Sequence, residues 1–256
     1  MSALPADSPA PGADPWAGLR AFTAARIALG RTGSSVPLRE ALAFRLAHAH
    51  ARDAVYSALD VEALLPALQP LGLPVRRVRS QAQDRPQYLH RPDLGRRLAA
   101  ECRRELTAAG HAPAHVVLIL ADGLSAEAVN RHAAPVLALL VPRLQQAGFR
   151  LAPLVVAEQA RVALSDDIGA AVAARLALVL IGERPGLSAP DSLGAYLTYG
   201  PRPGLTDEAR NCVSNIRPEG LPYAAAADKL LWLVQEALRR QLSGVPLKDE
   251  KDLLGQ

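Results

Sequence analysis

The stretch that decides the fold is His115–Ser125, which reads HVVLILADGLS. Its first seven residues form an apolar run without polar alternation, and DGLS follows directly. A short strand that is apolar on both faces is typical of a parallel sheet with helices covering both sides. The Gly and Ser after it indicate a turn that leads into a helix.

The same pattern repeats towards the C-terminus. The predicted elements are a helix over 125–147, a strand over 154–156, a helix over 165–175, a strand over 176–181 and a closing helix over 224–242. Strands separated by helices predict an α/β fold with a parallel sheet. We therefore expect a Rossmann-like parallel sheet domain over residues 112–247.

The preceding region, 21–111, is predicted to be mainly helical. Leu38, Leu42 and Leu46 recur every fourth residue and give a helix from about 34 to 57 one apolar face. Further helices are predicted over 61–68 and from Asp93 to Gly110, with a possible strand at 74–80 between them. On the second of these helices Cys102 shares an apolar stripe, which favours a core role for it.

Both ends of the sequence differ from the rest. Residues 1–20 are rich in Ala, Pro, Asp and Ser, so we expect a disordered tail, and 248–256 are expected to form a charged tail. The start of the sequence has no basic residues followed by an apolar run, so a secretory leader is not expected. The apolar runs elsewhere are too short to cross a bilayer. With two cysteines far apart in the sequence, a cytoplasmic location is expected.

The charge balance leaves nucleic-acid binding open as an alternative. The chain carries a formal net charge of +4, and its cations are mostly arginines. However, the arginines are scattered, and aromatic residues make up only 4% of the chain, so stacking platforms for bases are not indicated. A nucleic-acid-binding module is therefore the weaker hypothesis.

A ligand site is predicted where the strands end, because ligands of open α/β sheets bind beyond the carboxyl ends of strands. The segment 182–220 follows the third such strand and lacks regular periodicity, so we interpret it as a long, ordered binding loop. Within this segment, two hypotheses remain for Cys212. It could form part of the wall of a ligand pocket, or it could be a nucleophile, although the sequence does not identify the base that a nucleophile needs.

Common catalytic signatures are absent from the sequence. It contains neither G-x-G-x-x-G after the first strand nor G-x-S-x-G, and its six histidines lack metal-ligand spacing. These motifs therefore identify neither a catalytic residue nor a metal ligand. A self-sufficient α/β enzyme using Cys212 or Glu183 remains an alternative.

Several strings, in one order and spacing, resemble a single family. They are ARIALGRTG at 25–33, YLHRPDLGRRL at 88–98, ADGLS at 121–125, IGERPGL at 181–187, SLGAY at 192–196 and NCVSNI at 211–216. The similarity covers about residues 20–247. In these strings the chain resembles the small subunit of adenosylcobalamin-dependent ethanolamine ammonia-lyase.

That resemblance implies a subunit of a radical enzyme. The family converts ethanolamine to acetaldehyde and ammonia after homolysis of the cobalt–carbon bond of adenosylcobalamin. The substrate is implied to bind the large subunit, while the small subunit closes over the cobalamin at the interface of a hetero-oligomer. This chain is thereby implied to bind cofactor without carrying a catalytic residue.

The resemblance also implies three cobalamin contacts in this chain: Val162, Glu183 and Cys212. For Glu183, the alternative is an ion pair with Arg184 or another arginine. A further alternative, a structural subunit without cofactor, is disfavoured because Glu183 and Cys212 are present in their motifs.

The chain departs from the family pattern in two places. Relatives often have Gly where this chain has Ala160; if the position required positive φ, Ala would cost about 1 kcal/mol. Some relatives carry an N-terminal amphipathic helix that targets them to a bacterial microcompartment. Residues 1–20 show no such face, so a microcompartment location stays an alternative without a targeting helix to favour it.

Overall fold

The computed structural model describes residues 14, 16–23, 25–110 and 112–248. Most of the predicted disordered tail, 1–13 and 15, lies outside the described residues, as does the charged tail after Lys248. Within the predicted tail, residues 17–20 begin a 3-10 helix, η1 (Ala17–Phe22).

Six strands form one mixed sheet in the order β1-β3-β2-β4-β5-β6. They are β1 (Val75–Arg79), β2 (Ala114–Ala121), β3 (Leu154–Glu158), β4 (Ala174–Gly182), β5 (Leu193–Tyr199) and β6 (Arg210–Ile216). The first four strands in that order run parallel, and β5 runs antiparallel to both of its neighbours. The α/β prediction is thus confirmed, and β1 shows that the sheet begins before residue 112.

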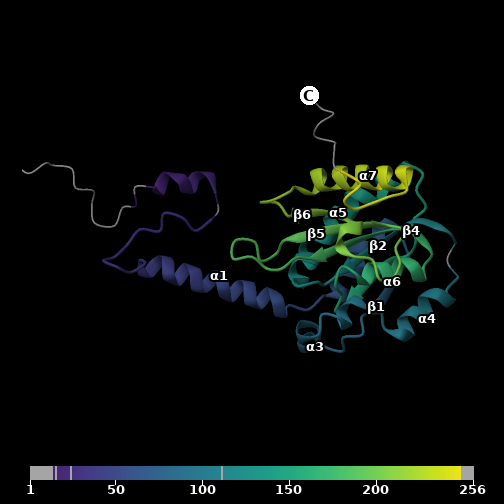
Figure 1. Cartoon of the computed structure of the whole chain (residues 1–256), viewed down its shortest axis with the longest axis horizontal. Helices are drawn as coiled ribbons and strands as arrows, with labels where there is room; N and C mark the ends of the chain where they lie inside the picture. Colours follow the sequence, from purple (N-terminus) through teal and green to yellow (C-terminus); the bar gives the residue numbers. More distant parts are fainter. Residues whose placement is uncertain (1–13, 15, 24, 111, 249–256) are drawn as a thin grey trace, which may run out of the picture.

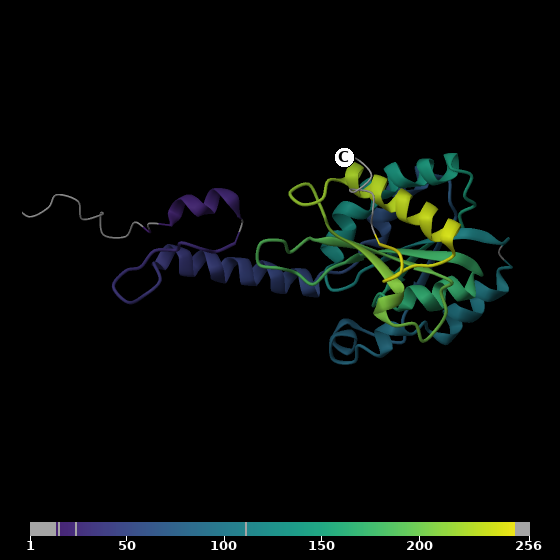
Figure 2. The same ribbon diagram turned by 45° about the horizontal axis from the view of Figure 1, so that its top comes forward.

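Helices cover both faces of the sheet (Figures 1 and 2). One face packs against α2 (Val61–Leu68), α5 (Ala126–Gln146) and α7 (Tyr223–Arg240). The other packs against α4 (Ala100–Ala108) and α6 (Leu164–Ala171). The remaining elements are α1 (Leu38–Tyr56), α3 (Arg85–His90), η2 (Gln69–Leu71), η3 (Leu94–Arg96) and η4 (Asp207–Ala209).

The apolar stretch 115–121, which lies in β2, forms the centre of the core. Alternate residues of β2 enter opposite layers: Leu118 lies in the cluster with α5 and α7, and Ile119 in the cluster with α4 and α6. Both side chains are buried. Each such aliphatic side chain contributes about 1.5–3 kcal/mol by leaving water, which explains why β2 is apolar without alternation.

Some helices begin or continue at other residues than the sequence predicted. The helix expected from Asp93 begins at Ala100, because a short 3-10 turn follows Asp93 and Leu98 then pairs with Ser80 in a β-bridge. Cys102 is nevertheless buried on it, as the stripe predicted. The long helix after β2 continues as one element through Pro135 and Pro142.

The interpretation of 182–220 as one irregular loop is wrong, and the sheet is not purely parallel. This segment contains β5 and β6, which add an antiparallel edge. On β5, Leu193, Ala195 and Leu197 are buried in the core layer and alternate with residues on the other face. On β6 the alternation breaks, because a bulge separates the buried Val213 and Ile216 by three positions.

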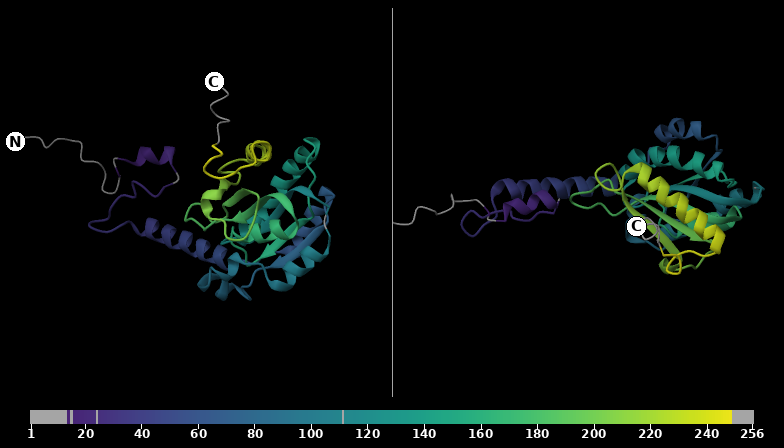
Figure 3. Two further views of the ribbon diagram at one scale, coloured as in Figure 1. Left: turned by 45° about the vertical axis from the view of Figure 1, so that its right-hand side comes forward. Right: turned by 90° about the horizontal axis from the view of Figure 1, so that it is seen from above.

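The helix α1 and the described residues before it project away from the sheet (Figures 1 and 3). The predicted apolar face of this helix exists, but the described residues of the chain do not cover it. Leu38, Leu42 and Leu46 are 74%, 53% and 58% exposed. Trp16 and Phe22, which precede the helix, are exposed as well.

Candidate functional site

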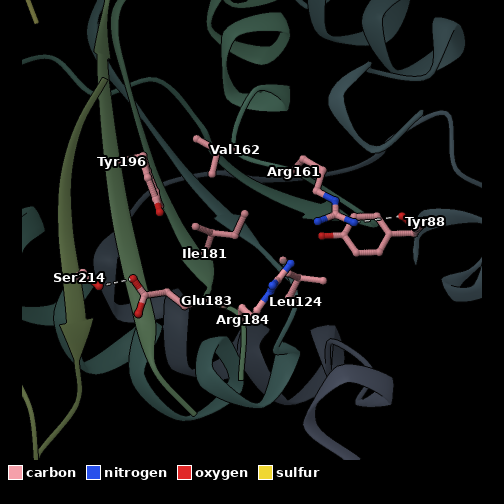
Figure 4. Close-up of a pocket in the computed structure, with 11 residues that line it drawn as sticks. Tyr88, Leu124, Arg161, Val162, Ile181, Glu183, Arg184, Tyr196 and Ser214 are labelled. Atoms are coloured by element: carbon pink, nitrogen blue, oxygen red, sulfur yellow. Dashed lines mark hydrogen bonds between the residues drawn. The ribbon is translucent and has the colours of Figure 1, made fainter. Parts of the chain in front are cut away.

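The carboxyl ends of the parallel strands form a crevice. The chain leaves β2 towards α5 on one face and leaves the neighbouring β3 towards α6 on the other, which is the arrangement that opens a ligand crevice in α/β sheets. A pocket of about 410 Å3 lies there (Figure 4). It is lined by Tyr88, Gly123, Leu124, Arg161, Val162, Ile181, Gly182, Glu183, Arg184, Tyr196 and Ser214.

Glu183 stands at the end of β4 and is held as a hydrogen-bond acceptor. Its Oε1 accepts from the Ser214 hydroxyl at 2.5 Å, and its Oε2 accepts from the Ser192 hydroxyl and, at 3.3 Å, from the backbone N–H of Asn215. Within the described residues it makes no ion pair with an arginine, so the ion-pair alternative is not supported. A carboxylate has about four acceptor positions, so one remains for a ligand.

The bulge in β6 makes this arrangement possible. Asn215 adopts a left-handed conformation (φ 58°), and the Ser214 hydroxyl and the Asn215 backbone N–H both reach Glu183. Bulges often re-aim side chains beside functional sites. Gly194 supplies the space, because a Cβ there would lie 2.8 Å from Oε1 of Glu183.

Val162 lies in the turn between β3 and α6 and lines the pocket. Its side chain packs partly against the α4–α6 core layer. Its carbonyl already accepts from the backbone N–H and the hydroxyl of Ser165, at 3.0 and 2.8 Å. The N–H of Val162 is therefore the backbone group that this residue can offer to a ligand.

Cys212 is exposed on β6, beside the pocket and not in its lining. It is the cross-strand partner of Tyr196 and precedes Ser214 by two residues on the same face of the strand. Although the residue as a whole is exposed, partial desolvation of its thiol raises the pKa of Cys212, and the negative charge of Glu183 raises it further, while hydrogen bonding to Tyr196 opposes the rise. The thiol therefore stays neutral near pH 7, which disfavours the nucleophile reading, because the thiolate is the reactive form.

Asp122 organises the turn that carries Val162, a role that the sequence did not reveal. This buried carboxylate accepts the backbone N–H groups of Gly123, Gln159 and Ala160 at 2.8–2.9 Å. It thus ties the end of β2 to the loop after β3. The left-handed residue of that loop is Gln159 (φ 54°) and not Ala160, so Ala at position 160 carries no such strain.

Tyr88 also forms part of the pocket wall, although the sequence offered only its motif as a signal. Its ring is fully buried between the guanidinium groups of Arg85 and Arg161, whose central carbons lie 4.7 and 4.2 Å from the ring centroid. Its hydroxyl donates to the carbonyl of Ala160 at 3.2 Å. The segment 85–90 is therefore joined to the Val162 turn.

Two general features complete the description. Across the described ranges, no group of three or more His, Cys, Asp or Glu residues is arranged to hold a metal ion. None of the helices in that part of the chain is long and apolar enough to span a membrane.

Comparison with known proteins identifies the family. Residues 13–248 match the family model described as ethanolamine ammonia-lyase light chain. The chain is 55% identical to a protein of Azotobacter vinelandii over 94% of this chain and 90% of that protein. It is 54% identical to one of Ralstonia nicotianae over 94% and 90%, and 56% identical to one of Rhodopseudomonas palustris over 92% and 90%. All three relatives are named ethanolamine ammonia-lyase small subunit. The chain belongs to the ethanolamine ammonia-lyase small-subunit (light-chain) family.

Proposed function

We propose that this chain holds adenosylcobalamin at the strand-end pocket and closes over it against the large subunit of an ethanolamine ammonia-lyase. Val162, Glu183 and Cys212 are the proposed contacts. The single observation that carries the proposal is the position of Glu183, an acceptor that lines the crevice and is held by Ser192, just before β5, and by Ser214 of β6.

The chemistry of the pocket fits the cofactor. The corrin ring is rimmed by amide groups, which need both acceptors and donors. Glu183 keeps an acceptor position, and Arg161 has a buried Nε without a hydrogen-bond partner among the described residues. Tyr196 and Val162 add apolar surface for the ring, and Cys212 would pack beside it.

The partner is proposed to complete the site. The pocket is open on one side. The helix α1, whose leucines are exposed, projects beyond the main body of the chain (Figure 3). An apolar helix face exposed in an isolated chain is typical of a protein interface. The word "small subunit" in the names of the relatives points to a larger partner.

The two subunits are proposed to have different roles. When bound, adenosylcobalamin supplies the radical chemistry, and ethanolamine is proposed to bind the large subunit. This chain's residues bind and orient the cofactor and exclude water from one side. Because both cysteines are free, we propose a cytoplasmic location. Encapsulation in a microcompartment is not proposed.

Co-expression tests the proposal. The chain is produced with its large subunit, adenosylcobalamin and ethanolamine are added, and acetaldehyde is followed, with each subunit alone as a control. Acetaldehyde from the pair alone supports the proposal. Turnover by this chain alone would instead favour the self-sufficient enzyme.

A further inference from the structure

Arg161 carries a half-buried charge that lacks a carboxylate partner. Within the described residues its guanidinium makes one hydrogen bond, from Nη2 to the carbonyl oxygen of Tyr88 at 3.2 Å. Its Nε is buried and has no hydrogen-bond partner. Removing a charged donor from water without a partner is costly, so such a group indicates a missing acceptor.

Three other arginines in the described part of the chain are paired with buried carboxylates. The following pairs join a guanidinium to a buried carboxylate: Arg85 with Asp122 at 3.6 Å, Arg103 with Asp167 at 2.5 Å, and Arg210 with Asp166 at 2.5 Å. Arg161 lines the pocket and has no such carboxylate partner among the residues that the structure describes. The difference points to an acceptor that comes from a ligand and not from the chain itself.

The position of Arg161 is fixed before any ligand arrives. Its guanidinium stacks on the ring of Tyr88, and its backbone N–H donates to the carbonyl of Gly95 at 2.8 Å. Gly95 is needed for this packing, because a Cβ there would lie 2.9 Å from the Tyr88 ring and 3.0 Å from Cγ of Arg161. A stacked arginine loses little further freedom when it binds.

Figure 4 shows Arg161 and Glu183 on different sides of the pocket, with Ile181 between them in this view. The pocket therefore offers an acceptor on one side and a planar donor on the other. Guanidinium groups favour oxygen acceptors such as carbonyls and phosphates. Cobalamin has both, as amide carbonyls on the corrin rim and as a phosphodiester in its nucleotide tail.

We propose that Arg161 is a further cobalamin-binding residue, which donates to an oxygen acceptor of the cofactor while Tyr88 holds it in place. The inference rests on the proposed function, since it requires that a corrinoid occupy this pocket. It assigns a role to a residue beyond Val162, Glu183 and Cys212.

The test measures corrinoid binding by the complex with the large subunit, from absorbance changes and without substrate. Arg161→Gln is expected to weaken cobalamin binding about tenfold or more, which is typical of losing a hydrogen bond from a charged group. Arg161→Lys keeps the charge but loses the planar fork, so a smaller loss is expected. Arg202→Gln, at an exposed arginine outside the pocket, is the matched control and should bind as wild type.

Cobinamide, which lacks the nucleotide tail, identifies the acceptor. An equal loss for cobalamin and cobinamide in Arg161→Gln places the acceptor among the amide carbonyls; a loss for cobalamin alone places it on the phosphodiester. Thermal unfolding and co-purification with the large subunit establish that each variant folds and assembles. Wild-type affinity for both corrinoids in Arg161→Gln would overturn this inference alone. A wild-type complex that binds neither corrinoid would overturn the proposed function as well.

Discussion

The hydroxyl of Ser214 donates a 2.5 Å hydrogen bond to Oε1 of Glu183 and so joins the edge strand β6 to the end of β4. The contact crosses β5, where Gly194 leaves room for the carboxylate. The antiparallel edge thus supplies one wall of a site that the parallel strands alone would leave open.

The space at Gly194 gives the first prediction. In Gly194→Ala the new Cβ would lie 2.8 Å from Oε1 of Glu183, so the flexible carboxylate must move. Cobalamin affinity of the complex is expected to fall about tenfold, the cost of one misplaced charged hydrogen bond. Gly186→Ala is the control, since its nearest neighbours lie 3.7 Å away. Equal affinities for the two variants would show that the carboxylate position does not matter.

Asp122 gives a prediction on pH. Burial raises the pKa of Asp122 to about 6, although three backbone N–H groups and Arg85 lower it. The folded state therefore binds the proton more tightly than the unfolded chain, whose carboxyl titrates near pH ~4. The contribution of Asp122 to stability is present below pH ~4 and is lost as the pH rises through about 6.

Denaturant unfolding of the wild type and of Asp122→Asn across this pH range provides the measurement. The unfolding free energy of the wild type relative to the variant is expected to fall between pH ~4 and ~6, because only the wild type releases this proton. A difference that stays constant over the range would contradict the assignment. Cobalamin binding by the variant is expected to weaken too, since Asp122 holds the turn that carries Val162.

The exposed face of α1 gives a prediction on assembly. The double variant Leu42→Ser, Leu46→Ser should change the unfolding free energy of the isolated chain by no more than about 0.5 kcal/mol, because both side chains are more than half exposed. Its affinity for the large subunit should fall about tenfold or more, from the loss of apolar surface that the interface buries. Sedimentation of mixed subunits measures the effect.

A change elsewhere on the same helix serves as the control. His48→Ser is also exposed but lies away from the leucine stripe, so it should assemble as wild type does. Wild-type assembly by the leucine variant would remove α1 from the interface and leave its exposed face without an explanation.

The parallel part of the sheet was predictable from the sequence, for a physical reason. A strand buried on both faces must be apolar throughout, and β2, β3 and β4 carry that signal in short runs. The strands β5 and β6 were missed because small and polar residues interrupt their apolar ones, so neither carries a continuous apolar run. In β6 the bulge at Asn215 also breaks the alternation that would have revealed the strand.

The site was predictable only in part. The rule that ligands bind at strand ends identified the turns that carry Val162 and Glu183, and both residues line the pocket. The roles of Asp122 and of the Tyr88–Arg161 stack could not be predicted, because they depend on contacts between segments 37 and 73 residues apart. Such contacts exist only once the chain has folded.

The most direct test of the central claim is cobalamin binding by the complex when Glu183 is changed. Glu183→Gln keeps the size of the side chain but replaces one acceptor oxygen by a donor, which then faces groups that also donate. Glu62→Gln, on an exposed glutamate far from the pocket in sequence and absent from its lining, is the control. The account predicts that Glu183→Gln binds cobalamin about tenfold or more weakly while assembling normally with the large subunit, and that Glu62→Gln binds as wild type. Wild-type affinity in a correctly assembled Glu183→Gln complex would contradict the account.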